Sequence, residues 1–574
     1  MNNLFDMRIR LETRLEAFLC RTLPLSYLLF CSFVFSIIFC LFEFNWDYLS
    51  GTSPYWRTPR GLIPGSYADI STAWSGYENF VHDAWRLPLF NVSKLGAPGG
   101  INIIFTDSIP ILAMSGRLIY LAAGITFNPF GWWTAGCFVA SAMSLTLLVA
   151  TRGPRELGPA MTATVCGLCM PTLLLRYGHL ALMAQWEIII AFVLYFQLQQ
   201  PRPSKWKTVA AVSFCAVALW THVYIFVMVL SIIVAGILQA TAARRISLWH
   251  GMTGLAVLLF IILTMVGASG YLVTGEPVED AGFGVYSSNL MSAFVPQLSG
   301  LFPIISGKII DATGGQYEGF CYLGGGTLLM IISTLPLLPS LLARSARKHA
   351  ILISVLVMFT IFAASNQVFF GYWRLATIPL PPFLMHMASV FRSSGRFMWP
   401  QIYLLTAAVI VVVPAFYGRA AGGRLLFIAA FLQFADTSPL SKALSARVAE
   451  AGEPPLAEVL WTSAIRRHSF IRVLPPLFCL GPEIGFARFS ALELDLLASH
   501  ENVAINTVVA ARHSENCNAT EIAPLAAGEL RVYMLVTPDV GPMSTPAKDC
   551  ATSDRLAVCS LALNPAELRA LSAQ

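Results

Sequence analysis

Long apolar runs alternate with short polar connections along most of this chain. Each run approaches the roughly 20 residues that a helix needs to cross a bilayer. A further apolar segment, about 109–124, is interrupted by Arg117 and Gly124, so we expect it to lie on the membrane surface. The remaining runs predict about eleven transmembrane helices, at about residues 25–44, 131–150, 158–175, 180–199, 207–221, 223–241, 251–272, 322–342, 349–365, 398–417 and 424–438.

Composition agrees with this pattern. Hydrophobic residues make up 56% of the 574 residues and charged residues only 12%, against roughly 25% charged in soluble proteins. The mean hydropathy is +0.66. So few charges cannot cover a soluble surface, which excludes a disordered chain and a soluble nucleic-acid-binding protein. We therefore predict an α-helical polytopic membrane protein, whose immediate surroundings are membrane lipids.

The distribution of basic residues predicts the orientation. Lys and Arg are concentrated on the cytoplasmic side of membrane proteins. If 109–124 does not span, all basic connections fall on the side of the N-terminus, which we expect in the cytoplasm of a bacterial inner membrane. These basic residues are Arg8, Arg10, Arg14 and Arg21, then Arg152, Arg155, Arg202, Lys205, Lys207, Arg244, Arg245, Arg344, Arg347, Lys348, Arg419 and Arg424.

Three long loops, 45–130, 273–321 and 366–397, are then predicted on the outer side. An odd number of spans also places the residues after about 440 outside, in the periplasm. This orientation divides the chain into a membrane domain, 1–439, and an outer domain, 440–574.

The outer domain carries more charge than the rest of the chain. Apolar stretches at Phe470–Val473, Val503–Val509 and Leu530–Val536 predict strands, and 443–461 and 490–500 predict helices, so we expect a small α/β domain. Four cysteines can form disulfides there if the compartment is oxidising. They are Cys479, Cys517, Cys550 and Cys559.

Two aspartates in the first outer loop are candidate catalytic acids. Asp69 precedes an aromatic helix, where a carboxylate can serve as a general base or a metal ligand. Its alternative role is to cap that helix. Asp107 precedes the surface helix, and capping is the stronger alternative there because Pro110 suits a first helical turn.

Basic and polar residues of the other outer connections complete the candidate site. Arg176 and His179 lie in a tight turn between two spans, where they could bind a phosphate or anchor at lipid headgroups. His222, in another outer turn, has the same two readings. The charges of Arg392 and Arg396 cost free energy beside apolar surroundings unless the side chains bind anions or extend towards the headgroups.

The second outer loop contains Asn289 and then Tyr317 and Glu318 among glycines, just before a predicted span. Such a segment suits a backbone that folds back into a cavity. Acids from two loops and arginines from the third would then face one outer cavity. A sugar carried on a polyprenyl phosphate fits that site, because arginines stabilise a phosphate leaving group and a carboxylate can deprotonate the acceptor.

Several of these motifs also resemble a bacterial family of uncharacterised membrane proteins in the GT-C glycosyltransferase superfamily. The resemblance extends over nearly the whole chain. The residues that carry it are Asp69, Trp74 and Trp85–Phe90; Phe105–Pro110; Arg176–Leu182; Gly315–Gly319 with Tyr322–Gly324; and Arg392–Phe397.

The resemblance implies a lipid-phosphate sugar donor and a functional acid in the first outer loop, which corresponds to Asp69. Many members have paired acids there. This chain has a single Asp at 69, with Glu78 and Asp83 further along, so the resemblance does not decide whether a divalent metal takes part. Some members invert the configuration of the sugar by direct displacement, which needs one base, and we expect that course.

We therefore expect a GT-C-type transferase that moves a sugar to a periplasmic glycan, lipid or protein. Asp69 is the expected base. The donor phosphate is expected at Arg392, Arg396, His179 and Arg176, and the sugar or acceptor at Asp107, Tyr317, Glu318, His222 and Asn289. Two alternatives are a glycolipid flippase, which requires a pathway that opens to both sides, and a non-catalytic assembly protein, which would tolerate substitution of these residues.

Overall fold

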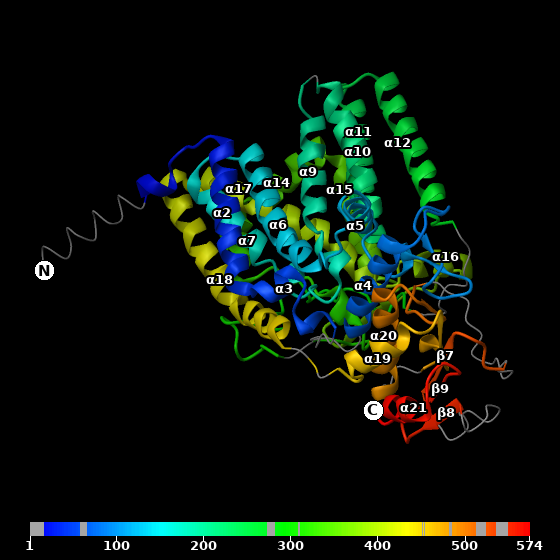
Figure 1. Cartoon of the computed structure of the whole chain (residues 1–574). Coiled ribbons are helices and arrows are strands. Elements are labelled where there is room, and N and C mark those ends of the chain that lie inside the picture. Colours follow the sequence, from blue (N-terminus) through cyan, green and yellow to red (C-terminus); the bar gives the residue numbers. More distant parts are fainter. Residues whose placement is uncertain are drawn as a thin grey trace, which may run out of the picture.

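The computed structural model is mostly helical, with a small sheet near the C-terminus (Figure 1). Arg8, Arg10, Arg14, Arg202 and Cys517, which the sequence singled out, fall outside the residues that it describes. The described residues are 16–57, 66–201, 203–272, 282–307, 310–450, 452, 454–480, 485–511, 524–534 and 549–574.

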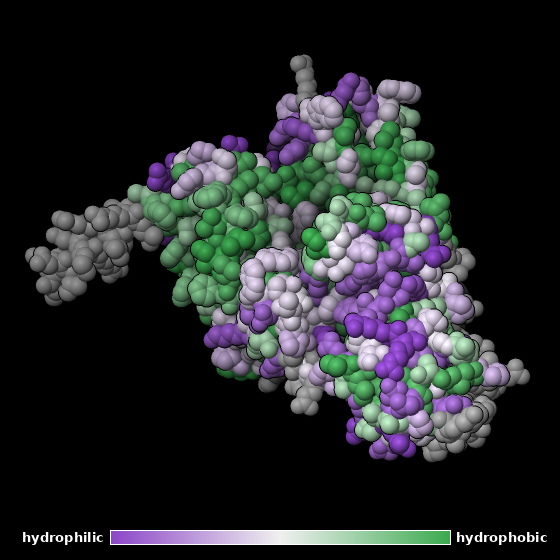
Figure 2. Space-filling view, viewed as in Figure 1, coloured by the Kyte–Doolittle hydropathy of each residue, from purple (hydrophilic) through white to green (hydrophobic). Residues whose placement is uncertain are grey.

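Within the described residues, seven helical segments are long and apolar enough to cross a membrane, which makes this a multi-pass membrane protein. Many of their large apolar side chains are exposed, as is typical of surfaces that contact lipid, and Figure 2 shows them as green areas over the helical bundle. The segments are α2 (Leu25–Glu43), α6 (Phe130–Arg152), α7 with α8 (Leu157–Leu168, Pro171–Leu174), η3 with α9 (Leu180–Met183, Trp186–Leu198), α11 (Val223–Ala242), α12 (Leu248–Ser269) and η6 with α17 (Ser394–Met398, Trp399–Tyr417).

The other four predicted spans are helical but differ from typical spans. The helices α10 and α15 have only 17 and 15 residues, and α18 extends over 31 residues and carries charged side chains. The count of eleven therefore stays a prediction. These elements are α10 (Lys205–Thr221), α13, η5 and α14 (Gly325–Thr334, Leu335–Leu337, Leu338–Lys348), α15 (Ala350–Ala364) and α18 (Arg419–Ala449).

The first loop packs as a small layer of short elements against one end of the bundle. Arg117 of its last helix is buried and donates to the carbonyls of Phe80 and Asp83, at the C-terminal end of α4. This explains the charge that interrupts the apolar segment 109–124. The elements are α3 (Trp46–Ser50), η1 (Pro54–Trp56), α4 (Ser66–His82), β1 (Asn91–Val92), β2 (Ile101–Asn102), η2 (Ile103–Phe105) and α5 (Pro110–Ala123).

The second and third loops are mostly irregular. The third contains an antiparallel hairpin, β3 with β4, whose register shifts between Val368 and Phe369. The short helix η4 carries Glu318. The elements of the two loops are η4 (Gln316–Gly319), β3 (Gln367–Phe370), β4 (Trp373–Thr377) and α16 (Pro382–Ser389).

The C-terminal part contains a five-stranded sheet with strand order β6-β5-β7-β9-β8, in which β5 is parallel to β6 and β7 while β9 is antiparallel to β7 and β8. This agrees with the predicted α/β domain. Its elements are α19 (Glu458–Ile465), β5 (Phe470–Leu474), η7 (Leu477–Cys479), α20 (Phe486–His500), β6 (Ala504–Ile505), β7 (Glu529–Met534), β8 (Cys550–Thr552), β9 (Leu556–Cys559) and α21 (Pro565–Ser572).

Two details of this part differ from the sequence prediction. The predicted helix 443–461 is wrong as a single element, because α18 ends at Ala449 and α19 begins only at Glu458. Pro454 and Pro455 lie between them, and a proline disfavours the helical conformation in the residue that precedes it. A disulfide joins Cys550 to Cys559, on the neighbouring strands β8 and β9, and Cys479 is also disulfide-bonded.

The C-terminal sheet is fastened to the first loop. Leu95 of the first loop lies beside the edge strand β6, where it forms a parallel bridge with Ile505. Backbone hydrogen bonds join these two segments of the chain on both sides of that bridge. The helix α20 packs beside α4, as Figure 1 shows. The first loop thus lies between the bundle and the C-terminal sheet.

Candidate functional site

Glu318 is the centre of a buried charge cluster. Its Oε2 accepts hydrogen bonds from Arg176 Nη1 at 2.7 Å and from Arg396 Nε and Nη2 at 3.1 and 3.0 Å. Arg176 also donates to the Glu318 carbonyl. Burial alone would raise the pKa of Glu318, but the two guanidinium groups hold it well below its usual range. The carboxylate is therefore ionised and shared by two arginines.

His179 connects this cluster to Asp69. The imidazole Nε2 lies 3.5 Å from Glu318 Oε1, and Nδ1 lies 3.1 Å from Asp69 Oδ2. Burial tends to lower the pKa of His179, but the two carboxylates raise it above its usual value. Burial also raises the pKa of Asp69, against the opposing effect of His179. A protonated imidazole between two carboxylates is the state that this geometry favours.

Asp107 forms a second acid–histidine pair, in which its Oδ1 lies 3.3 Å from His222 Nε2. Burial would raise the pKa of Asp107, but His222 lowers it to about 2, with help from His179 and Arg396. Asp107 has a φ of 58°, a left-handed conformation that non-glycine residues rarely adopt and that is often kept at functional sites.

The glycines beside these residues allow the loops to cross closely. A Cβ at Gly395 would lie 2.4 Å from the Gly319 Cα, so the two glycines let Arg396 approach Glu318. A Cβ at Gly76 of α4 would lie 2.2 Å from Ser108 Oγ. This contact brings the helix of Asp69 against the segment of Asp107.

Capping does not explain either aspartate. Asp69 lies inside α4, which begins at Ser66, so it is not the residue that caps this helix. Ile109 precedes α5 and makes no side-chain cap, while Pro110 occupies the first turn as predicted. Both carboxylates are about one third exposed, at 34% for Asp69 and 33% for Asp107, and each is directed towards a histidine.

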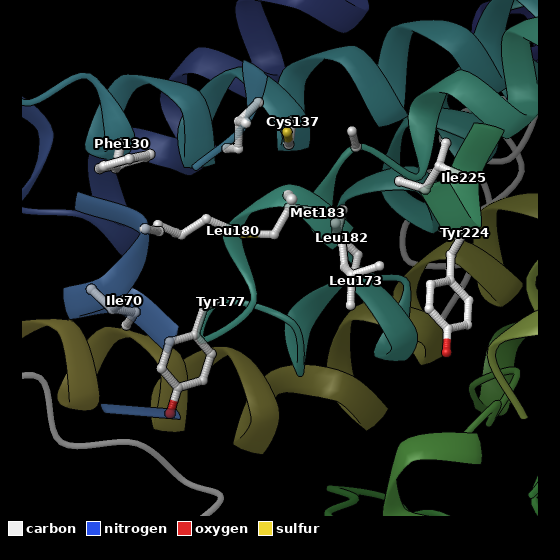
Figure 3. Close-up of a cluster of buried hydrophobic side chains, with 14 of the residues drawn as sticks. Ile70, Phe130, Cys137, Leu173, Tyr177, Leu180, Leu182, Met183, Tyr224 and Ile225 are labelled. Carbon is white, nitrogen blue, oxygen red and sulfur yellow. The ribbon is translucent and has the colours of Figure 1, made fainter. Parts of the chain in front are cut away.

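All of these groups lie at one end of the helical bundle, which we call the site end. Arg176 and His179 separate α8 from η3, His222 precedes α11, and Arg396 opens the last apolar segment. Figure 3 shows the apolar packing beneath this end, where side chains of α4, α6, α8, η3 and α11 meet. The rigid helix ends therefore position the polar groups.

The basic connections gather at the opposite end. Arg419 Nε lies 2.6 Å from Glu156 Oε1, and Arg419 Nη2 donates to the Cys20 carbonyl at 2.7 Å. Leu23 N donates to the Arg155 carbonyl at 2.9 Å. The helices α6, α9, α11 and α17 each run from the site end to such a connection. The alternation predicted from the basic residues thus corresponds to two chemically different ends.

The remaining candidate residues are placed differently. Arg392 is exposed, with its guanidinium carbon 5.8 Å from the Tyr286 ring centre. Tyr317 is half-buried beside Tyr286, and burial raises its pKa to about 12. Asn289 is buried, donates to Gln316 and the Gly371 carbonyl, and accepts from Gly371 N, so it joins the second and third loops. The hydrogen bonds described above for the cluster involve none of these three residues.

Tyr224 is a member of the site that the sequence did not single out. The Arg396 guanidinium carbon lies 4.9 Å from the Tyr224 ring centre, and the hydroxyl accepts a hydrogen bond from Ser393 N at 3.0 Å. Tyr224 follows His222 by two residues, in the first turn of α11, and this closeness to a candidate residue is the only sequence signal that points to it. Its ring helps to hold Arg396 against Glu318.

The acids of the site are its candidate metal ligands. Asp69 and Asp107 are the partly exposed acids of the site, and each already faces an imidazole. Within the described part of the chain, no group of three or more His, Cys, Asp or Glu side chains is placed to hold a metal ion.

Comparison with known families decides the relationship of the chain. Residues 33–438 match the model of a family described as a domain of unknown function, DUF6311, and residues 460–561 match the DUF6311 C-terminal domain. The chain belongs to the DUF6311 family. This confirms the resemblance to an uncharacterised membrane protein family that extends over both parts of the chain.

Comparisons with individual proteins add a distant likeness. No curated protein matches this DUF6311 chain. Among solved structures, it is similar to the archaeal oligosaccharyltransferase AglB from Archaeoglobus fulgidus in complex with an inhibitory peptide and a dolichol-phosphate, with 10% identity and a TM-score of 0.36. The match covers 84% of this chain and 64% of the archaeal chain, so it spans less than two thirds of that protein.

Proposed function

We propose that this protein is an integral membrane glycosyltransferase of GT-C type, which moves a sugar from a polyprenyl-phosphate donor to an acceptor. Support comes chiefly from one observation: Asp69, His179, Glu318, Arg176 and Arg396 form a continuous charge cluster at the end of a membrane helix bundle. Such a cluster suits a substrate that combines an apolar tail in the bilayer with a phosphate and a sugar at its surface.

In the proposed reaction Asp69 acts as the general base. Its carboxylate takes the proton of the acceptor nucleophile, which forms a bond to the anomeric carbon of the sugar. The bond between that carbon and the phosphate oxygen breaks, and its electron pair leaves with the phosphate. The attack comes from the face opposite the leaving group, so the configuration inverts. His179, 3.1 Å from Asp69, fixes the orientation of the carboxylate.

Arg396 and Arg392 are the proposed ligands of the donor phosphate. Arg396 gives Nε and Nη2 to Glu318, and within the described residues its Nη1 has no hydrogen-bond acceptor. Since a guanidinium carries five N–H donors in a fixed plane, Arg396 can be held by Glu318 and still bind a phosphate oxygen. Arg392 is exposed four residues earlier.

The other candidates receive supporting roles. Asp107 with His222, and the half-buried Tyr317, are proposed to contact the sugar or the acceptor. Arg176 is proposed to act through Glu318, to which both of its bonded nitrogens donate. Asn289 is proposed to maintain the loop that carries Glu318.

We place the site end on the outer face of a bacterial inner membrane, with the N-terminus in the cytoplasm and the C-terminal domain in the periplasm. The basic connections at the opposite end support this orientation. The disulfide between Cys550 and Cys559 also suits an oxidising compartment. The acceptor is then a periplasmic glycan, lipid or protein.

A glycolipid flippase and a non-catalytic assembly protein remain the alternatives. A flippase binds its substrate near the middle of the membrane and exposes it to both sides, whereas this cluster lies at helix ends. An assembly protein has no use for a base, so it tolerates loss of Asp69. The experiment below separates both from a transferase.

The test is turnover by the purified full-length chain. The protein is incubated with polyprenyl-phosphate sugars extracted from its host and with outer-membrane or periplasmic acceptors, and the released polyprenyl phosphate is measured. Wild type is expected to release it, and Asp69→Asn is expected to be slower by at least about a hundredfold, because a general base contributes roughly that much. A flippase or an assembly protein releases none.

Asp47→Asn is the matched control. Asp47 lies in the same outer loop, in the first turn of α3, and is exposed. It should keep wild-type turnover. Near-normal turnover by Asp69→Asn would remove Asp69 from the role of base.

A further inference from the structure

The two helices α4 and α20 lie side by side, and their contacts define a parallel register. Near their C-terminal ends, Asn79 Nδ2 donates to Ser499 Oγ at 2.6 Å, and beyond both helices the chain continues in parallel, since Leu95 forms a parallel bridge with Ile505. Earlier along α20, Glu493 pairs with Arg57. The C-terminal domain is therefore locked against the helix that carries Asp69.

This register brings the beginning of α20 to the site. Arg488 precedes Ser499 by 11 residues, and Asp69 precedes Asn79 by 10, so both stand about 15 Å before the shared hydrogen bond at 1.5 Å per residue. Consistent with this, Asp69 raises the pKa of Arg488, while burial, the larger effect, lowers it. The first turn of α20 thus places a guanidinium within electrostatic reach of the proposed base.

Arg488 also differs from the arginines within the cluster. Arg176 and Arg396 both donate to Glu318. Within the described part of the chain, no carboxylate lies within ion-pairing distance of Arg488, and its side chain is half-buried. A half-buried cation without an ion pair is costly unless it binds an anion.

We propose that Arg488 forms an anion subsite, through which the C-terminal domain binds a phosphate of the substrate beside Asp69. The proposal rests on the proposed function and deepens it, because residues of both domains then form the transfer site. The phosphate can be that of the polyprenyl donor or one carried by the acceptor. Both share the chemistry that a guanidinium recognises, namely charge-assisted hydrogen bonds to phosphate oxygens.

The experiment measures binding and needs no turnover. The full-length chain in detergent is titrated with a polyprenyl phosphate, with the corresponding polyprenol and with inorganic phosphate, and tryptophan fluorescence follows saturation. Wild type should prefer the phosphate over the polyprenol. Arg488→Gln should weaken binding of at least one of the two phosphates by about tenfold, the expected size for a charged hydrogen bond, and leave the polyprenol unchanged.

The two phosphates distinguish the source. A loss confined to the polyprenyl phosphate assigns the subsite to the donor, and a loss confined to inorganic phosphate assigns it to a phosphorylated acceptor. Unchanged binding of both phosphates overturns the proposal. If binding depends on Arg488 but no sugar is transferred, the proposed function fails and this inference stands.

Two variants control for indirect effects. Arg569→Gln removes an exposed arginine of α21 on the same domain and should bind like wild type. Ser499→Ala removes the hydrogen bond to Asn79 but keeps Arg488, so it reports loosening of the two helices. If Ser499→Ala weakens phosphate binding as much as Arg488→Gln, the effect is structural and the anion subsite is rejected.

Discussion

At the scale of single residues, the site depends on one carboxylate that serves several partners. Glu318 is bound by Arg176 and Arg396 and lies beside His179. Two guanidinium groups and one carboxylate give this buried group a net positive charge, next to the partly exposed Asp69. This arrangement keeps the arginines in position before any substrate arrives, which is the preorganisation that electrostatic catalysis requires.

Loss of Glu318 should therefore cost stability as well as activity. Glu318→Gln keeps the shape but leaves two buried arginines without their counter-charge, and we expect a loss of about 3 kcal/mol. Thermal unfolding in detergent measures it. The control Glu501→Gln removes the partner of the exposed Arg466 and should change little. Equal stability of the two variants would show that the buried cluster is not what holds the loops together.

The rate of transfer should depend on pH through Asp69 and His179. The pKa of Asp69 is raised above 3.8 and that of His179 above 6.5. Activity should rise as Asp69 ionises above its raised pKa and fall as His179 loses its proton above its own. His179→Gln removes a positive charge that lowers the pKa of Asp69, so the acid limb should move to higher pH and the alkaline limb should disappear. A pH–rate profile that His179→Gln leaves unchanged would contradict this assignment.

At the scale of elements, the site depends on close crossings between loops. Gly319 and Gly395 pack without side chains between them, and each stands next to a charged residue of the cluster. Close approach thus explains these two glycines, since neither Gly319 nor Gly395 has a positive φ.

Gly395→Ala should separate the two loops. Its Cβ would lie 2.4 Å from the Gly319 Cα and 2.9 Å from Ser288 N, so the backbone must move. A displacement of about 1 Å can lower the rate a hundredfold, which a transfer assay detects. Gly136→Ala, where the added Cβ meets nothing within 4 Å, should behave like wild type. If the Gly395 variant also does so, the crossing does not position Arg396.

Much of the architecture could be predicted from the sequence, because apolar runs such as those of α6 and α11, and the alternation in β5, are local patterns. The contacts of Glu318 could not. Arg176 and Arg396 are 142 and 78 residues away from it, and no local pattern encodes such pairs. Arg392 and Arg396 stand four apart, but the chain turns before η6 begins at Ser394, so their spacing in the sequence does not predict where the two guanidinium groups lie.

At the scale of the whole molecule, the bundle has a basic end and a site end, and the C-terminal domain is fixed to the latter. Its sheet is extended by the first loop at Leu95, and α20 lies along α4. A domain fastened in this way can contribute directly to the site as well as fold beside it. Orientation in the membrane then decides which compartment supplies the acceptor.

The two ends should face different compartments. A phosphatase that folds only outside the cytoplasm should be active when fused after Gln574 and inactive when fused after Arg245, in the connection between α11 and α12. The positive-inside distribution of the basic residues is the physical reason. If the activities are the opposite, the chain has the inverted orientation in the membrane. Equal activities at both positions would contradict the proposed topology.

The most direct test of the account is a structure of the full-length chain with a bound polyprenyl-phosphate sugar, determined by electron cryo-microscopy. We predict that the phosphate lies against Arg396 and that the anomeric carbon leaves room for a nucleophile within hydrogen-bond reach of Asp69, about 3 Å. A lipid phosphate bound among the basic connections at the other end, or beyond reach of both residues, would contradict the proposed glycosyltransferase site.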